Sequence, residues 1–282
     1  MNAEQIVYLN GQFLPVTEAK ISVLDRGFVY GDGVYEVVPL YARRPFRIAE
    51  HLARLDHSLA GIRLANPHSR EEWQHLIAEL AQRQPFDDQS VYLQVTRGVA
   101  KRDHAFPTGV PPTVFMMSNP LMLPSRTQVE QGVAVVTADD NRWRRCDLKT
   151  TSLLGNVLMR QLAADAGALE TVMFRDGFLT EASASNVLTA QQGTVVAPPK
   201  DNQILPGITY DAVLAFCAHA GVPFEIRPVP RDEALGADEL WLSSSTKEVL
   251  AITTVDGRPF AGGVPGPVFR RVYEAFQAAK RA

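Results

Sequence analysis

One lysine and one glutamate in this chain have the chemistry and the surroundings of a reactive pair. Lys149 stands between an arginine-rich run at 142–145 and the start of an apolar helical pattern. Glu181 follows about 30 residues later, just after a hairpin-type turn at Asp176-Gly177. An amine that forms a Schiff base and an acid that faces a pyridine nitrogen are what pyridoxal phosphate requires of a protein. Spacing alone also fits a structural salt bridge at Lys149, so the pair is a hypothesis.

The chain has only six lysines, so each can be weighed against Lys149. Four occur in polar, loop-like or strand-flanking sequence and are interpreted as solvated surface charges: Lys20, Lys101, Lys200 and Lys280. Lys247 lies in a Ser/Thr-rich stretch, but Glu248 beside it favours an ordinary ammonium. Lys149 has the best context, because small hydroxyl-bearing and apolar residues follow it. A lysine loses its proton readily when desolvated, whereas an arginine does not, and this suits lysine to act as a base.

A second group of residues could bind a phosphate. The stretch Leu205-Pro-Gly-Ile-Thr leads into a predicted helix, whose N-terminal amides at Ile208 and Thr209 would attract an anion. A plain Pro-Gly turn with a threonine cap is the alternative. Ser245 and Thr246 add hydroxyl and amide donors after a predicted strand, and Arg54 could add a charge-assisted bond, although an arginine on an amphipathic helix is usually solvated. No zinc signature, Walker loop or Gly-x-Gly-x-x-Gly pattern is present, and we expect no metal.

Composition limits the class of protein. The chain has 282 residues, 46% of them hydrophobic and 21% charged, which is typical of a folded chain with one large domain or two ordinary ones. A net charge of −3 gives no support to binding of nucleic acid or of a membrane surface. Cys146 and Cys217 lack metal-ligand spacing and favour a reducing compartment. With no secretory signal and no apolar run of about 20 residues, we expect a cytoplasmic protein.

The elements that must position these residues follow from hydrophobic periodicity. Alternating runs and turn residues predict strands at 6–9, 12–16, 34–41, 46–48, 90–97, 113–118, 132–139, 171–174, 178–180, 224–229 and 239–243, with two more around Gln192-Gly193. Helical spacing predicts helices at 49–61, 69–83, 152–166, 210–220 and from about 268 onward. Clustered strands with interspersed helices indicate an α+β protein. We expect a smaller α+β domain at 1–118, a linker at 119–128 and a larger domain at 129–282 carrying the lysine.

Several motifs, taken in order, resemble those of one family. They are Asp25-Arg-Gly-Phe-Val-Tyr-Gly-Asp-Gly-Val-Tyr-Glu, Glu50-His-Leu-Ala-Arg-Leu, Asp147-Leu-Lys-Thr, Thr180-Glu-Ala-Ser-Ala-Ser-Asn and Leu205-Pro-Gly-Ile-Thr. Together they resemble the fold-type IV pyridoxal-phosphate enzymes over nearly the whole chain. That family includes D-amino-acid and branched-chain aminotransferases and aminodeoxychorismate lyase. The resemblance is closest to the D-amino-acid enzymes, because an Arg-x-His pair at Arg102 and His104 follows the strand at 90–97.

The resemblance implies a fold and a role for each matching residue. It implies a two-domain chain with the active site at the domain interface, and a homodimer in which the Arg-x-His pair reaches across the subunit interface. Lys149 would be the Schiff-base lysine and Glu181 the partner of the pyridine nitrogen. The resemblance and the hydroxyl-rich stretch give a phosphate set of Arg54, Ile208, Thr209, Ser245 and Thr246, with Leu205 behind the ring. The substrate would be bound by Tyr35, Val37, Arg102 and His104, with the α-carboxylate held by the tyrosine, arginine and histidine.

The implied activity is a ping-pong transamination between D-amino acids of the D-alanine type and 2-oxo acids such as 2-oxoglutarate or pyruvate, by way of pyridoxamine phosphate. Two activities of the same family are alternatives, the transamination of branched-chain L-amino acids and the cleavage of aminodeoxychorismate. A non-catalytic pyridoxal-phosphate-binding protein is an alternative of another class. The chain departs from the D-specific pattern at Ala184, where a serine is often found, and at Pro206 and Tyr210, where basic residues are expected.

Overall fold

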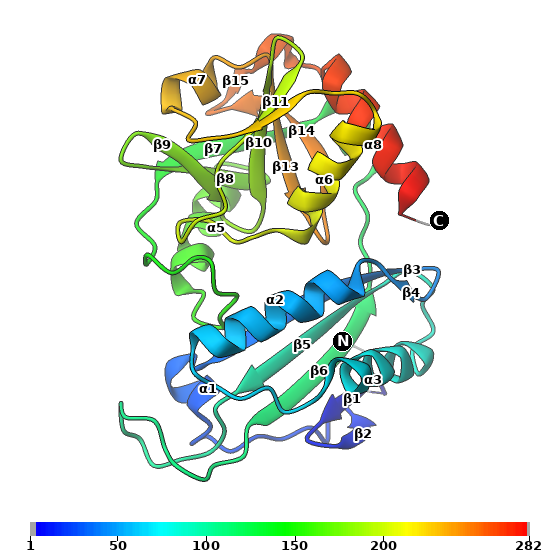
Figure 1. Cartoon of the computed structure of the whole chain (residues 1–282), viewed down its shortest axis with the longest axis vertical. Coiled ribbons are helices and arrows are strands. Elements are labelled where there is room, and N and C mark those ends of the chain that lie inside the picture. Colours follow the sequence, from blue (N-terminus) through cyan, green and yellow to red (C-terminus); the bar gives the residue numbers. More distant parts are fainter. Residues whose placement is uncertain (1–3, 281–282) are drawn as a thin grey trace. The chain divides into compact units, whose positions relative to one another are not determined.

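The backbone of the computed structural model falls into two units, and the structure describes residues 4–280. The first unit contains residues 4–121 and 148–153, and the second contains residues 122–147 and 154–280 (Figure 1). The units are therefore not contiguous in sequence, because the short segment that carries Lys149 packs with the first. The domain limits expected at residues 118 and 129 describe contiguous domains and stay a prediction.

A six-stranded antiparallel sheet forms the first unit, in the order β2-β1-β6-β5-β3-β4 among the described residues. Its elements are β1 (Ile6–Leu9), β2 (Gln12–Pro15), α1 (Arg26–Tyr30), β3 (Gly33–Tyr41), β4 (Arg44–Pro45), α2 (Ile48–Gly61), α3 (Arg70–Gln82), β5 (Gln89–Thr96) and β6 (Thr113–Pro120). The β1–β2 hairpin turns at Asn10 and Gly11, whose φ angles of 48° and 93° explain the choice of these two residues.

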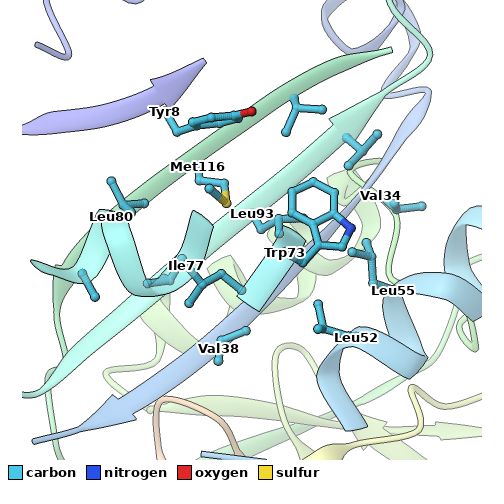
Figure 2. Close-up of a cluster of buried hydrophobic side chains, with 14 of the residues drawn as sticks. Tyr8, Val34, Val38, Leu52, Leu55, Trp73, Ile77, Leu80, Leu93 and Met116 are labelled. Carbon is cyan, nitrogen blue, oxygen red and sulfur yellow. The ribbon is translucent and has the colours of Figure 1, made fainter. Parts of the chain in front are cut away.

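The helices α2 and α3 cover one face of this sheet (Figure 1). Ser69 begins α3 with a reciprocal capping box, since its hydroxyl accepts from the amide of Glu72 while the Glu72 carboxylate accepts from the Ser69 amide. Behind the helices lies an apolar core, in which Figure 2 shows the Trp73 indole close to Val34 and Leu55. Successive residues of β3 point to opposite faces of the sheet, so one face is committed to this core and the other can carry chemistry.

A larger mixed sheet forms the second unit, in the order β12-β11-β10-β13-β14-β7-β8-β9 with β15 paired to β14 among the described residues. Its elements are α4 (Arg126–Gln131), β7 (Val133–Asp139), α5 (Leu154–Asp165), β8 (Glu170–Arg175), β9 (Phe178–Ala182), β10 (Asn186–Gln191), β11 (Thr194–Ala197), α6 (Ile208–His219), β12 (Phe224–Ile226), α7 (Arg231–Leu235), β13 (Glu239–Ser244), β14 (Glu248–Val255), β15 (Arg258–Pro259), a 3-10 turn (Ala261–Gly263) and α8 (Pro267–Ala279).

Helices α6 and α8 of the second unit pack side by side (Figure 1). Phe216 and Phe276 meet edge to face at 5.7 Å. The buried carboxylate of Glu239 accepts from the Trp241 indole and from the amides of Val268 and Phe269, which begin α8. That single carboxylate therefore joins the start of the last helix to strand β13.

The α+β fold predicted from the sequence is confirmed, but two local predictions were wrong. The strand expected at 46–48 is instead the two-residue strand β4, because Ala42 and Arg43 adopt positive φ and close the turn one step earlier. The helix expected at 210–220 begins two residues sooner, at Ile208. The elements α1, α7, β14 and β15 were not predicted. Within residues 4–280, no helix combines the length and the apolar character needed to cross a bilayer.

Candidate active site

The segment that carries Lys149 is bound to the beginning of β3. The carbonyl of Lys149 accepts from the Tyr35 amide at 2.9 Å, and its amide donates to the Ser58 hydroxyl at 3.1 Å. Two residues later, the Thr151 amide donates to the Gly33 carbonyl at 3.0 Å. The half-buried Lys149 side chain places Nζ 4.2 Å from the centre of the Tyr35 ring, a distance at which the ring face attracts a cation. The backbone of this lysine is therefore fixed, while its amine lies against the tyrosine.

Tyr35 and Val37, both predicted to bind substrate, project from the face of β3 opposite the apolar core. They share this face with Tyr92 of β5, which the sequence did not single out. The Tyr35 and Tyr92 rings stack with centres 5.5 Å apart, and the Tyr92 hydroxyl donates to Gln94 at 2.6 Å. Burial raises the pKa of Tyr92 to about 12, so its hydroxyl stays protonated at neutral pH.

Glu36, on the other face of β3, is the centre of a buried cluster. Its carboxylate accepts two bonds of 2.8 Å from Nε and Nη2 of Arg54 and one of 2.9 Å from Nδ1 of His51. Burial alone would raise the pKa of Glu36, but the Arg54 charge outweighs it and holds the pKa well below that of an ordinary glutamate. Burial lowers the pKa of His51, which favours the neutral imidazole. Arg54, predicted as a phosphate ligand, is held in a fixed position by this carboxylate; its phosphate role stays a prediction.

Arg102 and His104, the predicted carboxylate-binding pair, are exposed on the long segment between β5 and β6. Both approach the ring of Tyr30 in α1. The Arg102 guanidinium lies 5.3 Å from the ring centre, and the His104 ring lies 5.5 Å away. The structure therefore brings these two predicted residues together on one aromatic surface.

Glu181, on β9 of the second unit, is buried with three donors around its carboxylate. Arg142 donates to Oε1 at 2.7 Å, and Oε2 accepts from Asn186 at 3.1 Å and from the Leu205 amide at 3.0 Å. Burial raises the pKa of Glu181, and the Arg142 guanidinium opposes that rise. Arg142 also binds both oxygens of Asp140 at 2.9 Å, so one guanidinium joins two buried carboxylates.

Asn186 fixes the loop that leads into α6. Its amide donates to the Leu205 carbonyl at 2.8 Å as well as to Glu181, so Leu205 is held beside the carboxylate from both its N–H and its C=O. At Gly207 a Cβ atom would lie 1.9 Å from the Asn186 oxygen, so only glycine fits there. Ile208 and Thr209 then form the first turn of α6, which has no side-chain cap.

The turn after β13 carries Ser245 and Thr246, the other predicted phosphate ligands. The Ser244 hydroxyl accepts from the Lys247 amide at 3.1 Å and closes this turn. The Lys247 ammonium lies 2.9 Å from the buried Glu170 carboxylate, which also accepts from the hydroxyls of Ser183 and Ser185. Glu170 therefore joins the turn to the loop that follows Glu181.

The remaining lysines were judged correctly in part. Lys247 pairs with Glu170 and not with the adjacent Glu248. Glu248 instead binds Lys280 at 2.7 Å, and Lys280 is buried, so the prediction of a solvated tail residue was wrong. The side chain of Lys200 pairs with Asp211 at the surface. In the described part of the chain, no group of three or more His, Cys, Asp or Glu side chains could hold a metal ion.

Several residues of these clusters were not found from the sequence: Glu36, His51, Tyr92, Asp140, Arg142, Glu170 and Asn186. Arg142 was visible as part of the arginine-rich run, and Asn186 as the last residue of the Thr-Glu-Ala-Ser-Ala-Ser-Asn motif. Nothing in the sequence assigned them to Glu181.

Comparison with known proteins agrees with this arrangement. The family model for amino-transferase class IV matches residues 33–255. A D-alanine aminotransferase of Bacillus licheniformis is 40% identical over 271 residues, covering 96% of this chain and 95% of its own length. A D-alanine aminotransferase of Staphylococcus aureus (strain N315) is 36% identical over 272 residues, with 96% of each chain covered. The chain belongs to the class IV aminotransferases, and the predicted family is confirmed.

Solved structures with the same fold are branched-chain amino acid aminotransferases. The Escherichia coli enzyme has a TM-score of 0.93 at 23% identity and covers 98% of this chain and 95% of its own. That likeness concerns the fold alone. A second enzyme of this name, from T.th. and solved with pyridoxamine 5′-phosphate, has a TM-score of 0.92 at 25% identity, with 99% and 95% covered.

The Arg142 cluster generates a stability prediction. In Arg142→Met, Glu181 and Asp140 lose the cation that they share, and breaking such a buried pair costs about 3–5 kcal/mol. We expect the free energy of unfolding to fall by that amount in chemical denaturation at fixed protein concentration. Arg144→Met is the matched control, because Arg144 is exposed and its ion pair with the exposed Asp176 is long, at 3.6 Å; it should change by less than about 1 kcal/mol. Equal losses in both variants would contradict the assignment.

The Glu36 cluster generates a pH prediction. Both Glu36 and His51 have lowered pKa values, so the unfolded chain takes up protons that the folded chain refuses. Their contribution to stability is complete above the unfolded pKa of about 6.5 for histidine and is lost as pH falls, first through His51 and then below about 4.3 through Glu36. We expect the free energy of unfolding to fall from pH 7 to pH 4. His51→Gln should flatten the part between pH 7 and 5; an unchanged slope there would refute the role of His51.

Proposed function

We propose that this chain is a pyridoxal-phosphate-dependent aminotransferase that moves the amino group between D-amino acids of the D-alanine type and 2-oxo acids such as 2-oxoglutarate or pyruvate. The observation that carries the substrate class is the 40% identity, over nearly full length, to a protein named D-alanine aminotransferase. Arg102 and His104, close together on the Tyr30 ring, support the same class.

The residues of the second unit fit a phosphorylated pyridine cofactor. The first turn of α6 offers amides at Ile208 and Thr209 to an anion, because helix geometry gives them no partner within the helix and no side chain caps them. The Ser243 hydroxyl, at the end of β13, is buried and without a partner among the described residues, as a donor reserved for a ligand would be. Arg54, Ser245 and Thr246 complete the proposed phosphate ligands, and Leu205 the proposed contact with the ring.

Each catalytic residue would hold or move one proton. When bound, pyridoxal phosphate supplies an electron-withdrawing ring that stabilises the charge left at the substrate Cα. Lys149 Nζ is the base that we assign to the Cα proton, because an amine beside an aromatic ring and away from bulk water gives up its own proton readily. Glu181 is the carboxylate that we assign to the ring nitrogen. The raised pKa of this glutamate brings it closer to that of a pyridine, which favours a shared proton.

Arg102, with His104 and Tyr35, would hold the substrate α-carboxylate, and Val37 would line the same pocket. A planar guanidinium grips a carboxylate through two parallel bonds, so its position decides which face of Cα meets the base. We infer that the pair acts on the partner's site in a homodimer. Exposed apolar side chains on one face of α5 support self-association: Leu154, Val157, Leu158 and Leu162. A cytoplasmic location stays a prediction from the sequence.

Transamination of branched-chain L-amino acids is the second candidate, favoured by the names of the structural neighbours. Those neighbours are 23% and 25% identical, however, whereas the D-alanine aminotransferases reach 36–40%. We therefore place it second.

The test is the substitution Arg102→Ala, assayed as pyruvate formed from D-alanine with 2-oxoglutarate as acceptor. Loss of a charged, bidentate carboxylate contact should lower kcat/KM for D-alanine roughly a hundredfold or more. Lys101→Ala, in the same exposed segment, is the matched control and should leave kcat/KM unchanged. If Arg102→Ala retains nearly full activity, the carboxylate role is wrong.

A mixing experiment tests whether the contact crosses between subunits. Lys149→Ala and Arg102→Ala homodimers are each inactive or nearly so, but a mixed dimer would contain one site with both residues intact. After subunit exchange of equal amounts, about a quarter of the sites should be active if the pair acts in trans on a two-fold dimer. No recovery would place Arg102 in the site of its own subunit.

A further inference from the structure

The segment that carries Arg102 and His104 is long and mostly irregular, yet it is firmly attached to α1 of its own unit. It joins β5 to β6, and residues 101–106 are exposed (Figure 1). Nη1 of Arg26 donates to the Asp103 carbonyl at 2.5 Å and approaches the Ala105 carbonyl at 3.4 Å. These are the carbonyls on either side of His104. A single buried guanidinium thus fixes the backbone at the predicted carboxylate-binding residue.

Arg26 is itself held by a buried network. Its Nε donates to Oδ2 of Asp32 at 2.7 Å. The same carboxylate accepts from Nε and Nη2 of Arg97, at 2.9 and 3.0 Å, and Arg97 also donates to the Ile62 carbonyl at 2.7 Å. Burial alone would raise the pKa of Asp32, but Arg97 and Arg26 together lower it, so the aspartate is charged. The network therefore joins α1, the end of α2 and the end of β5.

Two aromatic rings complete the attachment. The Tyr30 ring lies between two guanidinium groups, with Arg26 at 4.8 Å and Arg102 at 5.3 Å from its centre. Further along the segment, the Phe106 ring lies 3.7 Å from the Arg97 guanidinium. Arg26 and Arg97 therefore contact the segment on both sides of His104, through hydrogen bonds at one point and ring faces at the others.

We propose that Arg26, held by Asp32 and Arg97, is a positioning residue for recognition of the substrate carboxylate. It would act through Arg102 and His104, by restricting them to one arrangement before substrate binds. An exposed segment without such an anchor would have to be ordered during binding, and that ordering would weaken affinity. The inference rests on the proposed function, because it assumes that Arg102 contacts the substrate. It also gives a purpose to the Asp25-Arg-Gly motif, which the catalytic chemistry does not use.

The first test is Arg26→Gln in the cofactor-loaded enzyme. We expect KM for D-alanine to rise about tenfold or more while kcat changes less than about threefold, the pattern of lost binding without lost chemistry. The visible absorption of the bound cofactor should not change. Arg26→Lys keeps the charge and should recover part of the loss. A fall in kcat with KM unchanged would overturn the proposal.

A double-mutant cycle separates positioning from a general structural effect. If Arg26 acts through Arg102, adding Arg26→Gln to Arg102→Ala should lower kcat/KM by less than about twofold further. Fully multiplicative effects of the two substitutions would overturn the proposal. If Arg102→Ala alone has no effect, the proposed function fails at the carboxylate contact, which is a different result from failure of the cycle.

Hydrogen exchange and a second variant guard against misfolding of Arg26→Gln. Phe106→Ala removes a half-exposed ring, so the fold should survive while the contact with Arg97 is lost. In both variants we expect faster amide exchange in residues 98–111 of the holoenzyme and no change in β8 to β10. In Phe106→Ala, KM for D-alanine should rise as well. Unchanged exchange in residues 98–111 together with unchanged KM would refute the anchoring role.

Discussion

A carboxylate removed from water is stable only when a cation and further donors accompany it, and each unit of this chain arranges its functional residues around such a carboxylate. In the first unit, Glu36 binds Arg54 and His51 on one face of β3, while Tyr35 on the other face receives the Lys149 amine. In the second, Glu181 binds Arg142, Asn186 and the Leu205 amide. Removing either carboxylate would leave a buried arginine without its partner, so structure and proposed function depend on the same ion pairs.

These ion pairs also explain how short, irregular segments hold definite positions. The Leu205 loop has no regular structure, but bonds to Glu181 and Asn186 fix both its N–H and its C=O. The Lys149 segment is held by backbone bonds to Tyr35 and by the Ser58 hydroxyl. Loops commonly carry the reactive groups of an enzyme, and rigid elements must then position them. Here strands β3, β9 and β13 provide that rigidity.

The sequence predicted the parts of the fold that follow from local rules. Asn10-Gly11 indicated a hairpin because both residues tolerate positive φ, and leucine spacing predicted α2 within one residue of its start. Local rules failed where the signal was short or distant. Helix α1 has five residues and contains a glycine, too few for a periodic pattern. The Arg142–Glu181 pair joins positions 39 residues apart, and Lys280 finds Glu248 across 32 residues. No spacing rule anticipates such pairs, so the predicted site lacked most of its supporting residues.

The measurement that tests the central claim most directly is the visible absorption spectrum of the purified holoenzyme, recorded as D-alanine and then L-leucine are added without any 2-oxo acid. The account predicts that D-alanine alone removes the visible band of the bound cofactor, with one pyruvate released per active site. Loss of the band with L-leucine but not with D-alanine would contradict the assignment of Arg102 and His104 as the groups that choose the D-amino acid.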